Sequence, residues 1–246
     1  MRDRKQYMKS SYAKYWINAR NLIYGTMPYD LSMIDKIDEI SKKNSVKKIL
    51  EVAIGTGDPI AADLLGKGYQ MSGVDISEIL IAKCKENYPK INAIVGDAEN
   101  IKLSNGSFDL VYCLHSAWLI PNFNRAISEM LRVVKKKGGV VIFDIQNSDN
   151  KSIQKIYRQH IFENKNLLGM AYKTFKNSAK LILRKGTQDW PFIVSQTPQK
   201  PSEMIDAIDL SIEKIKVFGV DGNGVLKKIS NDQHRQYQRL VFIVEN

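Results

Sequence analysis

Short apolar runs alternate with amphipathic stretches along most of the chain. These runs cover residues 49–52, 69–75, 91–95, 108–114 and 139–145. Such runs are typical of strands that are buried on both faces of a sheet. Between them, residues 59–65, 78–88 and 121–134 carry apolar positions at helical spacing. Strands that alternate with helices predict an α/β fold with a doubly wound, mostly parallel sheet.

The two ends of the chain and one internal segment depart from this alternation. Residues 1–42 predict two helices separated by a break at 24–29, and Asp30 is expected to cap the second helix. Residues 148–200 predict a helix and short strands in irregular order. The remainder predicts a helix over 201–208 and strands over 211–218 and 237–244. The turn at 219–224 contains three glycines and permits a hairpin.

A glycine-containing turn follows the first predicted strand. Gly55 and Gly57 lie in this turn, and the next strand ends at Asp75. A strand, a glycine turn, a helix and a second strand with an acidic tip form the nucleotide-binding half of a doubly wound fold. The glycines let the backbone approach a ligand closely, and the carboxylate can accept hydrogen bonds from both hydroxyls of a ribose.

The charges around the turn indicate which nucleoside binds. Glu51 and Asp58 place two carboxylates there, and Ile60 stands where a dinucleotide motif has its third glycine. A pyrophosphate binds at the uncovered N-terminus of the helix, and the two carboxylates would repel it there. S-adenosylmethionine has a ribose, a sulfonium and an ammonium group but no phosphate. The charge pattern therefore favours this cofactor over NAD.

The series Glu51-x-Ala53-x-Gly55-x-Gly57, followed by Asp75, resembles the first motif of the class I S-adenosylmethionine-dependent methyltransferases. The chain departs from the family once, with Ala53 in place of the first glycine, which narrows the space beside the methionine end of the cofactor. Residues 96–99, 108–111 and 131–139 match further family segments in order and spacing. The resemblance covers residues 46–146 well and implies a Rossmann-like sheet of seven strands whose last strand is antiparallel.

The resemblance also implies which residues bind the cofactor. Asp75 would hold the ribose hydroxyls, and Asp97 would accept from the adenine amino group, although Asp97 also fits an ordinary turn aspartate beside Gly96. Tyr15 and Arg20 are expected near the methionine carboxylate. The full set of expected cofactor-binding residues is Tyr15, Arg20, Glu51, Ala53, Gly55, Gly57, Asp75, Ile76, Asp97, Ala98 and Leu114.

The segment after the fourth strand, residues 114–118, is where the transferred methyl group would lie. His115 is the candidate catalytic residue, because an imidazole can take a proton near neutral pH. The alternative is a histidine that only shapes the pocket, since methyl transfer needs chiefly an in-line approach. Aromatic residues expected to bind the substrate, or else to form local cores, are Tyr24, Trp118, Tyr172 and Trp190.

These elements predict four segments in one α/β unit. Residues 1–45 form a helical lid, 46–147 the cofactor-binding core, 148–200 an inserted substrate cap, and 201–246 the completion of the sheet. The length of 246 residues and a hydrophobic content of 43% are sufficient for such a core.

Composition adds little beyond this organisation. The net charge of +11 raises nucleic acid as a partner, but the lysines are spread along the chain and indicate solvated helix faces. No apolar run reaches the ~18 residues of a spanning helix, and the N-terminus lacks a secretory apolar segment. Two unpaired cysteines, both expected to be buried, favour a cytoplasmic location. No His/Cys cluster has the spacing of a metal site, so no metal is expected.

The sequence therefore predicts a methyltransferase that moves a methyl group from S-adenosylmethionine to a nitrogen or oxygen of a small-molecule metabolite. S-adenosylhomocysteine would be the product. Two alternatives stay open: a C-methyltransferase of the quinone- or sterol-modifying type, and an RNA-binding methyltransferase. The sequence indicates neither the methyl acceptor nor the oligomeric state.

Overall fold

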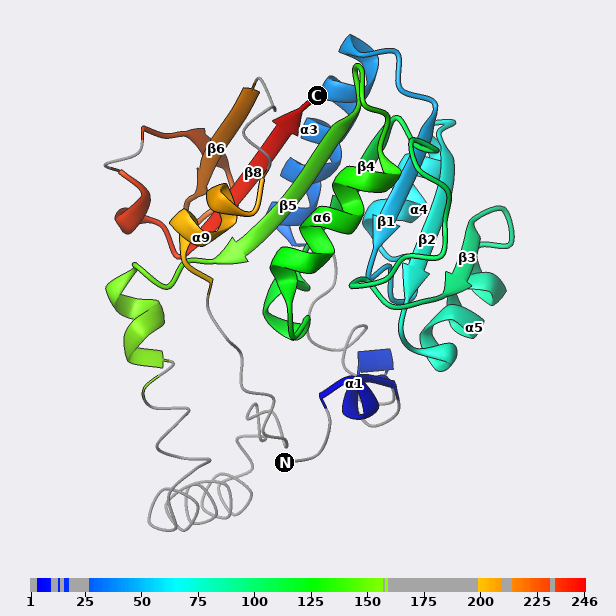
Figure 1. The fold of residues 1–246 in the computed structure, drawn as a ribbon, viewed down its shortest axis with the longest axis horizontal. Helices are drawn as coiled ribbons and strands as arrows, with labels where there is room; N and C mark the ends of the chain where they lie inside the picture. The colour runs from blue at the N-terminus through cyan, green and yellow to red at the C-terminus, as the bar shows by residue number, and fades with distance from the viewer. Residues whose placement is uncertain are drawn as a thin grey trace, which may run out of the picture.

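The computed structural model describes residues 4–9, 13, 16–17, 27–156, 158, 199–208, 214–230 and 233–246. Within these ranges a single twisted sheet lies between helices on both of its faces (Figure 1). The strands are β1 (Lys48–Val52), β2 (Gln70–Asp75), β3 (Asn92–Val95), β4 (Leu110–Cys113), β5 (Val140–Gln146), β6 (Lys214–Val220), β7 (Leu226–Lys228) and β8 (Arg239–Glu245). The helices are α1 (Arg4–Tyr7), α3 (Pro28–Lys43), α4 (Ile60–Gly66), α5 (Glu78–Asn87), α6 (Phe123–Val133) and α9 (Pro201–Asp206), with 3-10 turns η3 (Ala117–Leu119) and η4 (His234–Gln236).

The strand order is β3-β2-β1-β4-β5-β8-β6-β7. β1 to β5 are mutually parallel, whereas β8 runs antiparallel to both β5 and β6. The predicted doubly wound, mostly parallel sheet with an antiparallel last strand is therefore confirmed. The sheet has eight strands where seven were predicted, because the turn at 221–225 closes a hairpin that adds β7 to β6.

Alternate residues of the central strands feed two hydrophobic clusters, one on each face of the sheet. Ile49 and Tyr112 point to the face covered by α3, α4 and α5, whereas Leu50 and Val111 point to the face covered by α6 and α9. Figure 1 shows α3 and α4 behind the sheet and α6 in front of it. Burial on both faces explains why β4 and the first four residues of β5 are continuously apolar.

The start of α3 differs from the prediction. Asp30 was expected to cap this helix, but the helix begins at Pro28 and Asp30 lies in its first turn. The Asp30 carboxylate accepts a hydrogen bond of 3.3 Å from the backbone N–H of Met27, the residue before the helix. Proline suits the first helical position because its missing N–H would have no partner there. The predicted helix start was therefore three residues too late.

The topology determines where a ligand can bind. The order of the parallel strands reverses between β1 and β4, so the helices that follow these two strands lie on opposite faces. In open α/β sheets the crevice at the carboxyl ends of the strands, next to such a reversal, is the binding position. α1 lies beyond the carboxyl ends of β1 and β2 (Figure 1).

Candidate functional site

A cavity occupies this edge of the sheet. Its wall contains residues from the carboxyl ends of β1, β2 and β4, from the segment that follows β3, and from the N-terminal residues of the chain. Of the residues predicted from sequence, the cavity brings together Glu51, Ala53, Gly55, Asp75, Ile76, Asp97, Ala98, Leu114 and His115. Residues that were not predicted also line it, among them Lys5, Met8, Trp16, Ser116, Leu119 and Pro121.

The turn after β1 carries the first group of these residues. Ala53 and Gly55 have φ angles of 62° and 59°, in the left-handed region. The backbone N–H groups of Ala53 and Ile54 both donate to the carbonyl oxygen of Val74 on β2, at 2.7 and 3.1 Å. The turn is thereby tied to β2, and Gly55 exposes backbone to the cavity opposite Trp16.

Gly57 serves a different purpose from Gly55. A Cβ at Gly57 would lie 3.1 Å from the Tyr88 ring and 3.2 Å from the Cys84 sulfur, and Gly57 is not among the cavity-lining residues. Its role in the structure is the close packing of the turn against α5. Cys84 and Cys113 are both buried, as predicted.

Asp75, at the tip of β2, is 8% exposed and faces the cavity. Its carboxylate accepts hydrogen bonds from the backbone N–H groups of Gly55, at 3.0 Å, and Ser77, at 2.9 Å. Burial raises the pKa of Asp75 to about 6, although the N–H donors act in the opposite direction. The charge of this carboxylate therefore changes just below neutral pH.

Asp97 lies after β3 and is bound by the N-terminal helix. One of its oxygens accepts from the backbone N–H of Glu99, at 2.9 Å, and the other contacts the Lys5 ammonium at 2.6 Å. Lys5 also contacts the Glu99 carboxylate at 2.9 Å. Burial acts to raise the pKa of Asp97, but Lys5 and the backbone N–H together hold it below its usual value. Lys5 and the Glu99 N–H thus each hold one of the two Asp97 carboxylate oxygens.

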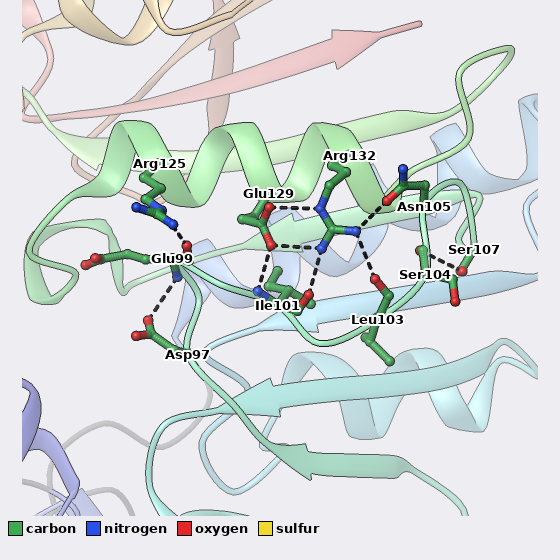
Figure 2. A network of polar contacts seen from close by, with 10 residues as sticks. All are labelled: Asp97, Glu99, Ile101, Leu103, Ser104, Asn105, Ser107, Arg125, Glu129 and Arg132. Carbon is green, nitrogen blue, oxygen red and sulfur yellow. Dashed lines mark hydrogen bonds and ion pairs between the residues drawn. The ribbon is translucent and has the colours of Figure 1, made fainter.

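The Arg132 guanidinium on α6 holds the loop between β3 and β4, as Figure 2 shows. Arg132 donates from α6 to the carboxylate of Glu129, on the same helix. It also donates to three loop groups at 2.6–2.9 Å, which are the carbonyl oxygens of Ile101 and Leu103 and the side chain of Asn105.

The other end of α6 fixes Glu99, two residues after Asp97. Arg125 donates to the Glu99 carbonyl at 2.9 Å, and the backbone N–H of Asn122 donates to the Glu99 carboxylate at 3.0 Å. Because Glu99 in turn holds Asp97 through its own N–H, α6 determines the position of the Asp97 carboxylate.

His115 follows β4 and has a φ angle of 59°, which is uncommon for a residue with a side chain. Its backbone N–H donates to the buried Asp144 on β5, at 2.8 Å. Its ring nitrogens contact protein groups on both sides: Nε2 lies 2.6 Å from Asp30 and Nδ1 lies 3.1 Å from Arg239. The sequence indicated the position of His115 but not the contacts of its ring with Asp30 and Arg239.

Some predicted residues fall elsewhere. Trp118 lies in η3 and packs with Met8 and Trp16 around Leu119, but it is not part of the cavity wall. Tyr15, Arg20, Tyr24, Tyr172 and Trp190 lie outside the described residues. Among the residues that the structure does describe, no cluster of three or more His, Cys, Asp or Glu side chains has a metal-binding arrangement. In the same part of the chain, no helix has the length and apolar character needed to cross a bilayer.

Comparison with known proteins agrees with this geometry. Residues 50–143 match the family described as "Methyltransferase domain". The chain is 31% identical over 110 residues to a phthiotriol/phenolphthiotriol dimycocerosates methyltransferase of Mycobacterium leprae. The matched region covers 43% of this chain and 40% of that protein. It is also 26% identical over 145 residues to a demethylmenaquinone methyltransferase of Beutenbergia cavernae. Here the matched region covers 59% of this chain and 60% of that protein.

Solved structures share the fold over nearly the whole chain. A possible histamine N-methyltransferase of Thermotoga maritima superposes with a TM-score of 0.56 and 17% identity, over 98% of this chain and 97% of that one. A TehB-like methyltransferase of Corynebacterium glutamicum also gives a TM-score of 0.56, at 15% identity over 96% of both chains. At these identities the structural matches establish the fold, and the chain spans 40% and 60% of the length of the two curated relatives named above.

Proposed function

Because the chain belongs to the class I S-adenosylmethionine-dependent methyltransferases, we propose that it transfers a methyl group from that cofactor to a small-molecule acceptor. The observation that carries this proposal is Asp75, a buried carboxylate at the tip of β2 that holds the glycine turn and faces the cavity. A carboxylate in this position is suited to the two hydroxyls of a ribose.

The charge of the cavity fits the cofactor. Among the described lining residues, five are carboxylates and one is a lysine: Glu51, Asp58, Asp75, Asp97, Glu99 and Lys5. An acidic wall favours a ligand with a sulfonium and an ammonium group and disfavours a pyrophosphate. Asp75 would hold the ribose and Asp97 the adenine, while Glu51 would lie near the methionine end.

The residues of this chain would mainly position the cofactor and the methyl acceptor relative to each other. When bound, S-adenosylmethionine provides an electrophilic methyl group on a sulfonium, and transfer depends on an in-line approach of the acceptor. Leu114, His115 and Ser116, at the end of β4, line the same cavity as Asp75. They would border the place where the acceptor meets the methyl group.

We propose a nitrogen or oxygen of the acceptor as the methylated atom. Apolar residues from the N-terminal segment and from the region after β4 line the cavity beside His115, and they favour an acceptor with an apolar part: Met8, Trp16, Leu119 and Ile120. A second candidate is methyl transfer to carbon of a quinol. It is favoured by the relatives named demethylmenaquinone methyltransferases, and the chain covers 60% of the one from Beutenbergia cavernae.

The test is methyl uptake from cofactor that carries a deuterated methyl group. Purified protein would be incubated with panels of amines, phenols and reduced naphthoquinones, and products would be detected by mass spectrometry, with Asp75→Ala as the inactive control. Labelled amine or phenol supports the first candidate, and labelled quinol supports the second. Labelling of RNA with none of the small molecules would overturn both. Cofactor binding without transfer to any acceptor would contradict an enzymatic role.

A further inference from the structure

We propose that Asp30 and Arg239 hold the His115 imidazole as a neutral ring with its proton on Nε2, so that His115 positions the methyl acceptor and takes no proton from it. The statement about the ring stands on the structure alone, and the statement about the acceptor rests on the proposed function. Asp30 and Arg239 are thus positioning residues that act through His115.

The backbone of His115 is fixed first. Its left-handed φ of 59° is unfavourable for a residue with a Cβ, so the conformation needs support from its surroundings. That support comes from Asp144, which is 3% exposed and accepts the His115 N–H at 2.8 Å. Asp144 also accepts from the Tyr29 hydroxyl at 2.9 Å and pairs with Arg239 at 3.2 Å. A backbone held in this way directs the ring toward the cavity wall.

The ring nitrogens have different partners. The Arg239 guanidinium remains charged and can only donate, so Nδ1, at 3.1 Å, must present its lone pair. A proton on Nδ1 would set two donors and two positive charges against each other. Asp30 has no exposed surface and accepts at 2.6 Å, so the proton of the neutral ring belongs on Nε2. The two contacts specify one tautomer.

The other groups around the ring are consistent with this assignment. The described titratable side chains that face it are Asp30 and Tyr29 from α3, Asp144 from β5 and Arg239 from β8. Burial, with Asp144 adding to it, raises the pKa of Tyr29 well above its usual value, so its hydroxyl stays a donor. Arg239 also stacks over the Tyr29 ring at 4.4 Å. Its guanidinium supplies positive charge between the two carboxylates without an imidazolium.

This arrangement restricts the acceptor. Both nitrogens of His115 are engaged, so a proton on the acceptor has no free ring nitrogen to move to. The acceptor's lone pair forms the new bond to the methyl carbon, sulfur keeps the electron pair of the broken bond, and the acceptor's proton goes to water. Suitable acceptors are those that need no base: amines that are unprotonated at the working pH, and phenols, enols and carboxylates that ionise without help.

The ring state can be measured without any acceptor. The full chain, labelled with ¹⁵N in its three histidines, would be studied at pH 7.5 by long-range ¹H–¹⁵N correlation, with His115→Gln used to assign the signals. We expect a bare Nδ1 and a protonated Nε2 for His115. A proton on Nδ1, alone or together with one on Nε2, would overturn the proposal. This result does not depend on methyl transfer, so it separates the inference from the proposed function.

Two variants give a matched comparison. In Arg239→Met the donor to Nδ1 is lost, and the Nδ1 signal should move, whereas His234, which contacts Asp149 at 2.9 Å, serves as the internal reference. Lys216→Met removes a cation that pairs with Glu245 on the same sheet and should leave the His115 signals in place. If Arg239→Met fails to fold, the tautomer measured in the wild type decides the proposal on its own. Unchanged His115 signals in the folded arginine variant would contradict the role of Arg239.

A kinetic readout follows once an acceptor is found. Loss of a general base costs about 10²–10⁴-fold in kcat and removes a limb of the pH profile. His115→Asn offers an amide in place of the ring, and we expect the pH profile of kcat to keep its shape. Loss of one limb of that profile would show that His115 is the base.

Discussion

Replacement of Ala53 by glycine should stabilise the protein, although alanine is ordinarily the better residue for stability. Ala53 has a φ of 62°, in the left-handed region, where a Cβ costs about 1–2 kcal/mol. Glycine removes this cost but gains freedom in the unfolded chain, which offsets about 0.5–1 kcal/mol. The difference leaves a net stabilisation of about 0–1.5 kcal/mol, centred on about 0.7 kcal/mol, and this central value corresponds to an increase in Tm of about 1–3 °C for a chain of this size.

Thermal and urea unfolding of Ala53→Gly would measure this difference. The matched control is Ala82→Gly, which makes the same chemical change at an exposed position inside α5. The control should lose about 1 kcal/mol, because glycine is a poor helix former. Opposite signs for the two variants are the expected result. If Ala53→Gly destabilises the protein as much as Ala82→Gly does, the left-handed conformation of the turn is refuted.

Three further predictions test the cofactor end of the cavity. Affinity for S-adenosylhomocysteine should be constant above about pH 7 and should fall as the pH drops through about 6, by up to about tenfold per pH unit. The reason is that protonation of Asp75 removes an acceptor for the ribose hydroxyls. A pH dependence that persists in Asp75→Asn would contradict this prediction. Lys5→Ala should bind the same ligand up to about fivefold more tightly, because the partly exposed ion pair between Lys5 and Asp97 no longer competes with the ligand. The control variant Lys83→Ala, which loses an exposed ion pair with Glu86, should not change the affinity. Weaker binding by Lys5→Ala would show that Lys5 assists the cofactor. Arg132→Leu should lower the free energy of unfolding by about 1–3 kcal/mol, measured with urea, because the carbonyl oxygens of Ile101 and Leu103 lose their donor from α6. An unchanged midpoint would show that Arg132 does not hold the loop between β3 and β4 to α6.

The parts of this protein that could be predicted from sequence are those set by short-range patterns. Continuous apolar runs and helical spacing gave the alternation of strands and helices, because burial on one or two faces determines those periods. The glycine turn and Asp75 lie within one strand-turn-helix-strand unit, so their proximity follows from chain connectivity. Residues from these units line the cavity.

The parts that could not be predicted depend on contacts between distant segments. Lys5 meets Asp97 across 92 positions, and Arg239 meets His115 across 124 positions. Neither pair leaves a local pattern, since a lysine in an N-terminal helix and an arginine at the start of a strand are equally consistent with exposure to solvent. The role of His115 depends on such contacts, and the sequence could therefore only name it as a base or an orienting group.

The central claim is that Asp75 belongs to a nucleoside site for S-adenosylmethionine, and calorimetric titration of S-adenosylhomocysteine tests it most directly. Wild type, Asp75→Ala and a control titration with NADH would be compared at pH 7.5. We expect clear binding to wild type, a loss of about 1.5–3 kcal/mol in the variant from the missing charged hydrogen-bond partner, and no heat from NADH. Equal affinity in wild type and Asp75→Ala, or binding of NADH in place of the homocysteine nucleoside, would contradict the account.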